Sequence, residues 1–313
     1  MTVTRMSTGP AVIADSACRA GMGSSCSSIR ISMRYYRYHA VGNDYIVFSD
    51  DDLLGAPNPA EIRRICHRNF GLGSDGILLH VDDANRETFA LRIFNPDGSE
   101  SEKSGNGLRI FARYLFDRKR VGDAPFEVNT AGGTVTCVVH DQGRSVTVDM
   151  GRLKFDSAKI PVAGDQREVL REHFTIAGVN LEYSCASIGN PHCVLLRNRL
   201  SEDETRALGP LIEIEPRFPN RTNVQFMKVI DRNNIEIQIW ERGAGYTLAS
   251  GSSSSAAAGV AHRLGLCDDD IMVSMPGGKI QIEISPSFDI RMTGPVTHIA
   301  DGELDPECLE GAS

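Results

Sequence analysis

The sequence predicts an α+β fold, and three features of the 313-residue chain support this prediction. Apolar and polar residues alternate in several short segments, as they do in strands with one buried face. Two other segments carry apolar residues at helical spacing. Turn residues such as those at 140–143 separate neighbouring strand segments, which favours antiparallel hairpins over βαβ crossovers.

The expected elements follow from these two periodicities. Alternation predicts strands at Phe89 to Phe94, Val135 to Val139, Val146 to Met150, Ile235 to Trp240, Ile280 to Ile284 and Ile290 to Met292. Helical spacing predicts one helix through Leu108, Phe111, Ala112 and Leu115, and a second through Ala257, Val260, Ala261 and Leu264. Each helix is expected to begin directly after a Ser-Gly pair, at Ser104-Gly105 and Ser250-Gly251.

The two helices have related surroundings, which suggests two domains. Each follows an alternating strand and a Gly-containing loop, and Ser104 and Ser250 lie about one domain length apart. A chain of this length also fits two domains of ordinary size better than one small core. The pattern suggests duplicated domains that face each other across a cleft, although unrelated strand-loop-helix units can produce the same pattern.

The composition excludes several classes of protein. A hydrophobic fraction of 41% and a charged fraction of 24% are typical of a soluble globular chain, and no apolar run is long enough to span a bilayer. The net charge is −8 with scattered acidic residues, so no basic face exists for nucleic acid. We therefore expect a small-molecule partner, with no membrane and no nucleic-acid partner.

The eight cysteines are widely spread and form no CxxC pair, which argues against a zinc site and favours reduced thiols in a cytoplasmic protein. Residues 1–32 are rich in Ser and Gly, and their apolar stretch is too short for a signal-peptide core. We predict a disordered extension there. An organelle presequence is an alternative, and a start at Met33 is favoured over it.

Gly-rich loops precede both expected helices. The first loop runs from Asn95 to Ser99 and then through Ser104-Gly105-Asn106-Gly107, and the second runs from Glu241 to Thr247 and then through Ser250-Gly251-Ser252. Glycines let a ligand approach the backbone, and the free N–H groups of a helix start favour a carboxylate. Two such starts facing one cleft would hold an amino-acid carboxylate from both sides. The alternative is that both are ordinary helix caps.

Further motifs accompany these loops in a fixed order: Gly42-Asn43-Asp44, Gly71-Leu-Gly73-Ser-Asp75-Gly76, Gly189-Asn190-Pro191-His192 and Arg221-Thr-Asn223-Val224. Together the six motifs resemble the motif set of the diaminopimelate epimerase family, from about Met33 to Leu304. The resemblance implies two pseudo-symmetric α+β domains, each a mostly antiparallel sheet wrapped around a central helix, with the active site between them. It implies domains at 33–148 plus 289–304 and at 149–288, followed by a tail at 305–313.

The resemblance also implies a reaction. The family inverts an α-carbon without pyridoxal phosphate, metal or other cofactor, using two cysteines on opposite faces of the substrate. Their counterparts here are Ser104 and Ser250. A thiol with a pKa of about 8.5, lowered at a helix start, gives a usable thiolate near neutral pH, whereas a serine hydroxyl does not. A plain exchange of Cys for Ser should slow the reaction by several orders of magnitude.

Three explanations of the paired serines compete. Engineered Cys→Ser substitutions are disfavoured, because Lys103, Tyr246 and the run 252–255 also depart from the family pattern and indicate natural divergence. In the second explanation a neighbouring base, His192 or Lys103, activates a serine. In the third the protein binds an amino acid without racemising it, or is a lyase with one base. The sequence does not choose between the last two.

The resemblance assigns substrate contacts as well. Asn43, Asn95, Asn190, Asn223, Glu241 and Arg242 correspond to residues that bind the distal amino-acid end of diaminopimelate. Arg can pair with a carboxylate and Glu with an ammonium. A turn role is favoured for any one Asn taken alone, and only the presence of all of them favours substrate binding. Gly105, Asn106, Gly251 and Ser252 would hold the reacting carboxylate.

His192 is included among the expected substrate contacts, and a structural role is favoured for it over catalysis, because it follows Pro in a turn. Cys193 beside it is expected to be a buried strand residue. The predicted function is thus conversion of LL- to meso-diaminopimelate, in lysine and cell-wall precursor biosynthesis, or racemisation of a related diamino acid. A homodimer is possible.

Overall fold

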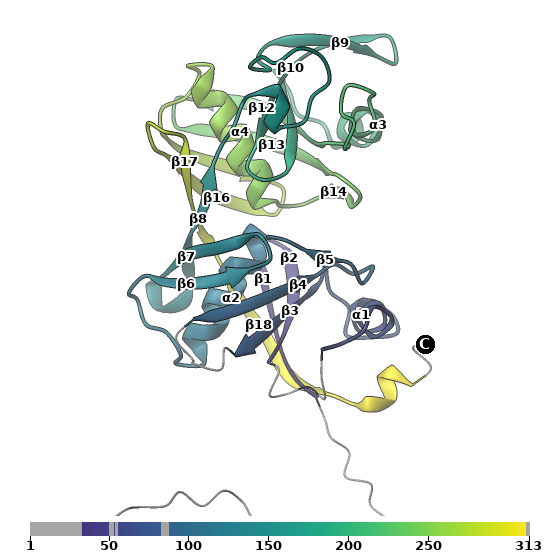
Figure 1. Cartoon of the computed structure of the whole chain (residues 1–313), viewed down its shortest axis with the longest axis vertical. Helices are drawn as coiled ribbons and strands as arrows, with labels where there is room; N and C mark the ends of the chain where they lie inside the picture. The colour runs from purple at the N-terminus through teal and green to yellow at the C-terminus, as the bar shows by residue number, and fades with distance from the viewer. Residues whose placement is uncertain (1–32, 50–52, 54–55, 83–87, 311–313) are drawn as a thin grey trace, which may run out of the picture. The chain divides into compact units, whose positions relative to one another are not determined.

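The computed structural model describes residues 33–49, 53, 56–82 and 88–310, all of which belong to one compact unit. The predicted extension at 1–32 lies outside the described residues, as do residues 311–313 of the tail. Within these described ranges, strands dominate and four α-helices accompany them, so the α+β prediction is confirmed (Figure 1).

The first half of the unit carries helix α2 among its strands. β1 pairs antiparallel with β2, β2 parallel with β3, β3 antiparallel with β4, and β4 parallel with β6. Antiparallel pairs β4–β5, β6–β7 and β7–β8 complete the set. The elements are β1 Met33–Ala40, β2 Asn43–Ser49, α1 Pro59–Cys66, β3 Ile77–Asp82, β4 Phe89–Phe94, β5 Glu100–Ser101, α2 Gly105–Asp117, β6 Phe126–Thr130, β7 Gly133–His140 and β8 Ser145–Arg152.

The second half repeats this pairing order around helix α4. β10 pairs antiparallel with β11, β11 parallel with β12, β12 antiparallel with β13, and β13 parallel with β15. Antiparallel pairs β13–β14, β15–β16 and β16–β17 follow, and β9 pairs with β10. The elements are β9 Glu172–Ile176, β10 Val179–Ser187, β11 Pro191–Leu196, α3 Glu202–Glu213, β12 Asn223–Asp231, β13 Asn234–Glu241, β14 Gly245–Thr247, α4 Gly251–Arg263, β15 Asp270–Met275, β16 Gly278–Ile284 and β17 Asp289–Pro295. The predicted duplication is therefore visible in the strand pairing.

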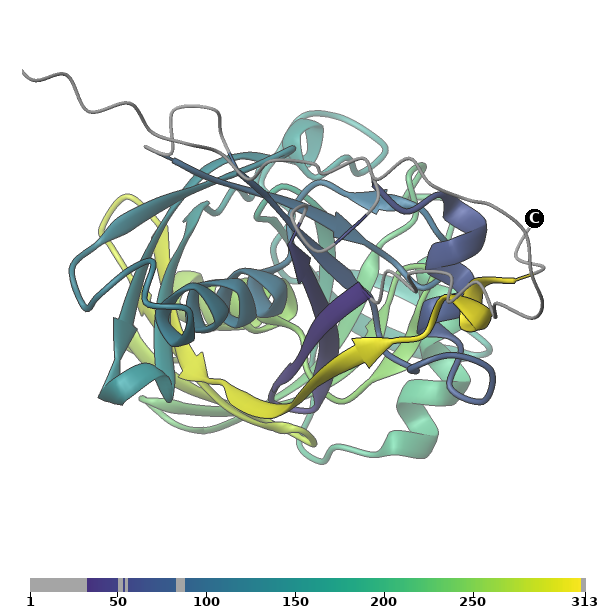
Figure 2. The same ribbon diagram turned by 90° about the horizontal axis from the view of Figure 1, so that it is seen from below.

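Strands late in the chain connect the two halves. β17 pairs with β16 on one side and with β8 on the other, and β18, Thr297–Leu304, pairs antiparallel with β1. Figure 2 shows β18 in yellow lying along the purple β1. Because β17 belongs to the ladders of both halves, the division into 33–148 plus 289–304 and 149–288 stays a prediction.

Helices α2 and α4 are both buried, α2 with its large apolar side chains and α4 with its small side chains. Leu108, Phe111 and Leu115 of α2 are fully buried, as the helical spacing predicts. α4 is rich in Ser and Ala, and its polar run is satisfied locally, since the hydroxyls of Ser254 and Ser255 donate to carbonyls four residues earlier. Such small side chains let strands approach the helix closely on all sides.

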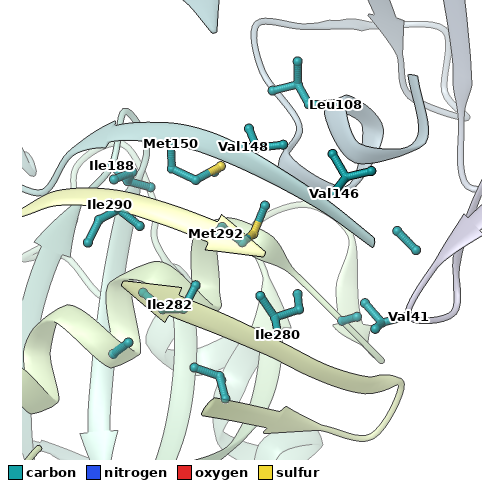
Figure 3. Packing of buried hydrophobic residues seen from close by; sticks show 14 of the residues in the cluster. Val41, Leu108, Val146, Val148, Met150, Ile188, Ile280, Ile282, Ile290 and Met292 are labelled. Carbon is teal, nitrogen blue, oxygen red and sulfur yellow. The ribbon is translucent and has the colours of Figure 1, made fainter. Parts of the chain in front are cut away.

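An apolar layer joins β8, β17 and the start of α2. Figure 3 shows Met150 of β8 and Met292 of β17 among aliphatic side chains that include Leu108 and Ile282. All four side chains are buried in one continuous cluster, so the two halves share part of their hydrophobic core.

All six strands expected from alternation are present, and both expected helices form, with Leu264 as the C-cap of α4. One detail differs from the expectation. Each helix begins at the glycine of its Ser-Gly pair, and the serine is the N-cap residue in extended conformation.

Candidate functional site

The N-termini of α2 and α4 meet. A Cβ placed on Gly251 would lie 3.5 Å from the Cα of Gly105 and 2.8 Å from the sulfur of Met292. A Cβ on Gly105 would lie 2.9 Å from the Met292 methyl group and 3.1 Å from that of Met150. Only glycine permits this approach, so the sequence feature that starts each helix also lets the two helix starts touch.

Ser104 caps α2 on one side of this contact. Its Oγ accepts the backbone N–H of Gly107 at 3.1 Å and lies 3.3 Å from the hydroxyl of Tyr45, on β2. Tyr45 is buried, and burial raises the pKa of its hydroxyl to about 12, with the negative charge of Glu241 adding to the rise. Tyr45 is thus held as a protonated neighbour of Ser104.

Ser250 caps α4 on the other side. Its Oγ accepts the Ser253 N–H at 3.4 Å and lies 3.5 Å from the Ser252 hydroxyl. Glu241, at the end of β13, is its acidic neighbour: burial raises the pKa of Glu241, and hydrogen bonding with Ser250 opposes the rise. Each N-cap serine therefore has one ionisable partner, Tyr45 for Ser104 and Glu241 for Ser250.

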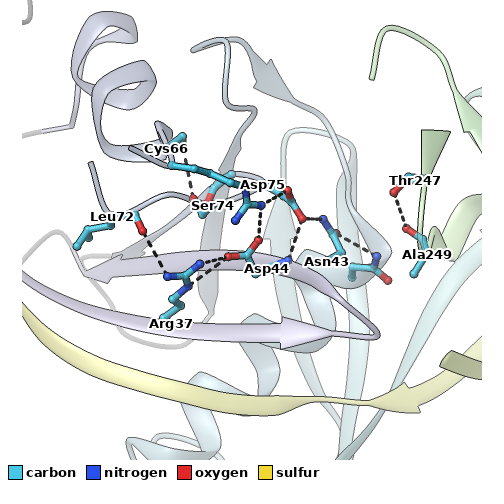
Figure 4. A network of polar contacts seen from close by, with 12 residues as sticks. Arg37, Asn43, Asp44, Cys66, Leu72, Ser74, Asp75, Thr247 and Ala249 are labelled. Atoms are coloured by element: carbon cyan, nitrogen blue, oxygen red, sulfur yellow. Dashed lines mark hydrogen bonds and ion pairs between the residues drawn. The ribbon is translucent and has the colours of Figure 1, made fainter. Parts of the chain in front are cut away.

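Asn43 and Asn106 form a chain of side-chain amides beside the α2 start. Asn106 Nδ2 donates to Asn43 Oδ1 at 3.0 Å, and Asn43 Nδ2 donates to Asp75 Oδ2 at 3.0 Å. Figure 4 shows this line of contacts continuing from Asp75 into an ionic cluster with Asp44 and Arg37. The motifs around Asn43 and Asp75, far apart in sequence, are thus brought together at one helix start.

A second polar group lies beside the α4 start. Asn190 Nδ2 donates to the Ser252 hydroxyl at 3.5 Å, and Asn190 Oδ1 lies 3.0 Å from His192 Nε2. His192 is fully buried, and burial lowers its pKa to about 3, so the ring is neutral at pH 7. The predicted structural role of His192 agrees with these contacts, which fix Asn190.

The two bases suggested for activating a serine make other contacts. The ring of His192 bonds Asn190, and Lys103 Nζ donates to the backbone carbonyl of Met150 at 2.7 Å. Cys193 is fully buried and lies opposite Cys185 on the neighbouring strand, as expected of a core thiol. The groups that do approach the serines, Tyr45 and Glu241, come from other elements.

The remaining asparagines and Arg242 hold turns. Asn223 Nδ2 donates to the Pro191 carbonyl at 2.9 Å, and its Oδ1 accepts the Arg242 N–H at 3.0 Å. The exposed Arg242 side chain donates to the Asn220 carbonyl at 3.0 Å. Asn95 closes the turn between β4 and β5, bonding the Ser99 hydroxyl at 3.0 Å. Their roles in substrate binding stay predictions. Asn95 is a turn residue, whereas Asn223 is the first residue of β12.

The described part of the chain contains no group of three His, Cys, Asp or Glu side chains placed to hold a metal ion. Over the same residues, no helix is long and apolar enough to cross a membrane.

Sequence reasoning missed Tyr45 and Asp75 as members of this site. Both lie inside motifs that were recognised, Tyr45 directly after Gly42-Asn43-Asp44 and Asp75 within the 71–76 loop. Periodicity could have singled out Tyr45, because on a strand Asn43 and Tyr45 share one face. Nothing local indicates that this face meets the start of α2.

Comparison with known proteins places the chain among epimerases. The family model described as diaminopimelate epimerase matches residues 35–155 and 184–299. A relative from Nostoc sp. named diaminopimelate epimerase 2 is 57% identical over 275 residues, covering 88% of this chain and 96% of the relative. The diaminopimelate epimerase of Moorella thermoacetica is 36% identical over 277 residues, covering 87% and 99%.

Solved structures share the fold at much lower identity. A hydroxyproline epimerase from Agrobacterium vitis matches with a TM-score of 0.65 and 14% identity, over 91% of this chain and 95% of that one. A PhzF-family phenazine biosynthesis protein from Bacillus anthracis matches with a TM-score of 0.62 and 15% identity, over 87% and 98%. These two similarities concern the fold alone.

Proposed function

The chain belongs to the diaminopimelate epimerase family, and we propose that it inverts an α-carbon of diaminopimelate, or of a similar diamino acid, between Ser104 and Ser250. The predicted enzyme class, an amino-acid epimerase, is confirmed by this membership. The substrate and the role of each residue are the parts that we propose.

The observation that carries the proposal is the contact between the two capped helix starts. In each first turn the capping serine takes one N–H group, that of Gly107 or of Ser253, and the N–H groups before it have no partner inside their helix. The helix dipole makes both ends positive. A carboxylate placed beside the point where Gly105 and Gly251 meet would accept hydrogen bonds from both turns. The α-carbon attached to that carboxylate would then lie between the two serine hydroxyls.

The partners of the serines suggest how a proton could be exchanged. As Ser250 Oγ takes the α-proton, the hydroxyl proton of Ser250 passes to the Glu241 carboxylate, which burial makes more basic than an ordinary glutamate. The Ser104 hydroxyl then delivers its proton to the opposite face of the carbanion, and Tyr45 replaces that proton. Reaction in the other direction reverses each transfer.

Protonation of Glu241 also eases the step at Tyr45. The Glu241 charge contributes to the high pKa of Tyr45, so neutralising that carboxylate removes one of the causes that hold the phenol proton in place. The two proton transfers would therefore support each other, although a hydroxyl pair remains slower than a thiol pair.

Incubation with LL-diaminopimelate in deuterium oxide tests the proposal. We expect deuterium at the α-carbon together with formation of the meso isomer, in the absence of added pyridoxal phosphate. Binding without deuterium uptake would indicate an amino-acid-binding protein, the function favoured if the serines are inert. Release of ammonia or water would indicate a lyase. The absence of both binding and turnover would refute diaminopimelate as the ligand.

A further inference from the structure

Arg109 is an arginine without an acidic partner among the residues that the structure describes. It lies on α2, one turn beyond Asn106, and its side chain is fully buried. Its Nη2 donates to Asn106 Oδ1 at 2.6 Å, while Nε and Nη1 have no hydrogen-bond partner in the described part of the chain. Burial lowers its pKa to about 9, and no neighbouring carboxylate counteracts this. A buried unpaired cation is costly and demands an explanation.

A glycine on the neighbouring strand leaves space for this side chain. Gly294 of β17 lies against the guanidinium, and a Cβ at that position would collide with Arg109 Nη1. Two residues earlier on the same face of β17, Met292 contacts both Gly105 and Gly251. Arg109 therefore lies beside the strand that supports the meeting point of the two helix starts.

Arg109 also fixes the orientation of two side-chain amides. A guanidinium can only donate, so Asn106 must turn its oxygen toward Arg109 and its NH₂ toward Asn43. At the other end the Asp75 carboxylate can only accept, so Asn43 must turn its NH₂ toward Asp75 (Figure 4). With a donor at one end and an acceptor at the other, the whole line has one arrangement.

The acidic end of this line is already neutralised. Asp75 Oδ1 pairs with Arg68 at 2.7 Å, and Asp44 pairs with both Arg68 and Arg37. The charge at the Arg109 end has no such compensation among the described residues, and it adds to the positive ends of α2 and α4. An anion at the helix starts would supply the missing charge.

We propose that Arg109 is a positioning residue that holds Asn106 and Asn43 in one orientation and supplies buried positive charge for the substrate carboxylate. This inference rests on the proposed function, because it identifies the anion as the carboxylate bound beside the point where Gly105 and Gly251 meet. Arg109 acts through Asn106 and the local field, without touching the substrate.

Arg109→Met tests the proposal, because Met keeps much of the apolar stem and removes the charge. We expect the dissociation constant for diaminopimelate, measured by calorimetry, to rise at least tenfold, while the melting temperature stays equal or rises because an unpaired buried charge is gone. Arg109→Lys keeps the charge but not the planar donor pair, so it should recover part of the affinity. The matched control is Arg113→Met, which loses an ordinary ion pair with Asp117 further along α2 and should bind normally.

A second readout does not depend on the ligand. In the wild type, the side-chain NH₂ groups of Asn43 and Asn106 should give distinct, slowly exchanging NMR signals, and both should broaden or exchange faster in Arg109→Met. Unchanged affinity and unchanged amide signals in a folded Arg109→Met variant would overturn the inference. If Arg109→Met does not fold, the same result in Arg109→Lys would overturn it. If the wild type binds no diaminopimelate, the proposed function fails, and the amide signals still decide whether Arg109 orients the two asparagines.

Discussion

Restoring a thiol at both helix starts should accelerate α-proton exchange strongly. In the double variant Ser104→Cys/Ser250→Cys, each sulfur would occupy an N-cap position, where the present hydroxyls accept N–H groups at 3.1 Å and 3.4 Å. Those N–H groups and the positive helix ends stabilise a thiolate more than a thiol. The variant therefore changes the acidity of the two groups and leaves their surroundings in place.

The size of the gain follows from the acidities. A thiol with a pKa of about 8.5 is about one-tenth ionised at pH 7.5. A hydroxyl as weakly acidic as water, with a pKa of about 15.7, lies roughly 7 pH units higher, equivalent to about 10 kcal/mol. The gain in rate is smaller than this difference in acidity. A thiolate is a weaker base than an alkoxide and abstracts a proton less readily, and in the wild type Glu241 accepts the hydroxyl proton of Ser250. We expect a gain of about 10²- to 10⁴-fold.

The assay is deuterium uptake at the α-carbon of diaminopimelate, followed by mass spectrometry under single-turnover conditions. Ser201→Cys is the matched control, because Ser201 caps α3 in the same way, accepting the Glu204 N–H at 3.3 Å, away from the meeting helices. The control should show no gain. A folded double variant that binds diaminopimelate but exchanges no faster than the wild type would refute the assignment of the two serines.

Three further predictions concern packing and charge. Gly251→Ala places a methyl group 2.8 Å from the Met292 sulfur. This should destabilise the fold by about 1–3 kcal/mol and slow deuterium exchange at the α-carbon about 10²-fold. The control Gly122→Ala, with open space around it, should change neither the free energy of unfolding nor the exchange rate. Asp44→Asn should lower the free energy of unfolding by about 1–3 kcal/mol; because ion pairing lowers the folded pKa of Asp44, this difference should persist at neutral pH and vanish as pH falls through that pKa. Because burial raises the pKa of Glu241, exchange by the wild type should fall with decreasing pH earlier than an ordinary glutamate pKa of about 4.3 would give, and Glu241→Gln should abolish that limb of the pH profile.

Much of the fold could be predicted because its signals are local. Alternation located β4 at its exact bounds, and helical spacing located α2 and α4. Among the strands that were not predicted, β2 and β11 are buried on both faces, where alternation disappears. β1 and β15 do alternate, and they were missed although this signal was present. Helix α1 was not predicted, although the sequence carries a signal for it: Asn58 and Glu61 form a capping box around Pro59.

The candidate site divides in the same way. The serines at 104 and 250 could be identified because an N-cap and the glycine after it depend on a few neighbouring residues. The partners of these serines could not, because Tyr45 and Glu241 reach them from strands far away in the sequence. Strand register and helix placement decide such contacts.

The sequence by itself determined that two helices start with a capping serine and a glycine, because backbone hydrogen bonding and steric freedom are properties of the segment. The tertiary structure alone decided that these starts touch, that Asn43 and Asn106 form one line, and that Arg109 is buried beside them with no carboxylate partner among the described residues. Burial and charge compensation depend on every element packed around a group, so no single segment of the chain can specify them.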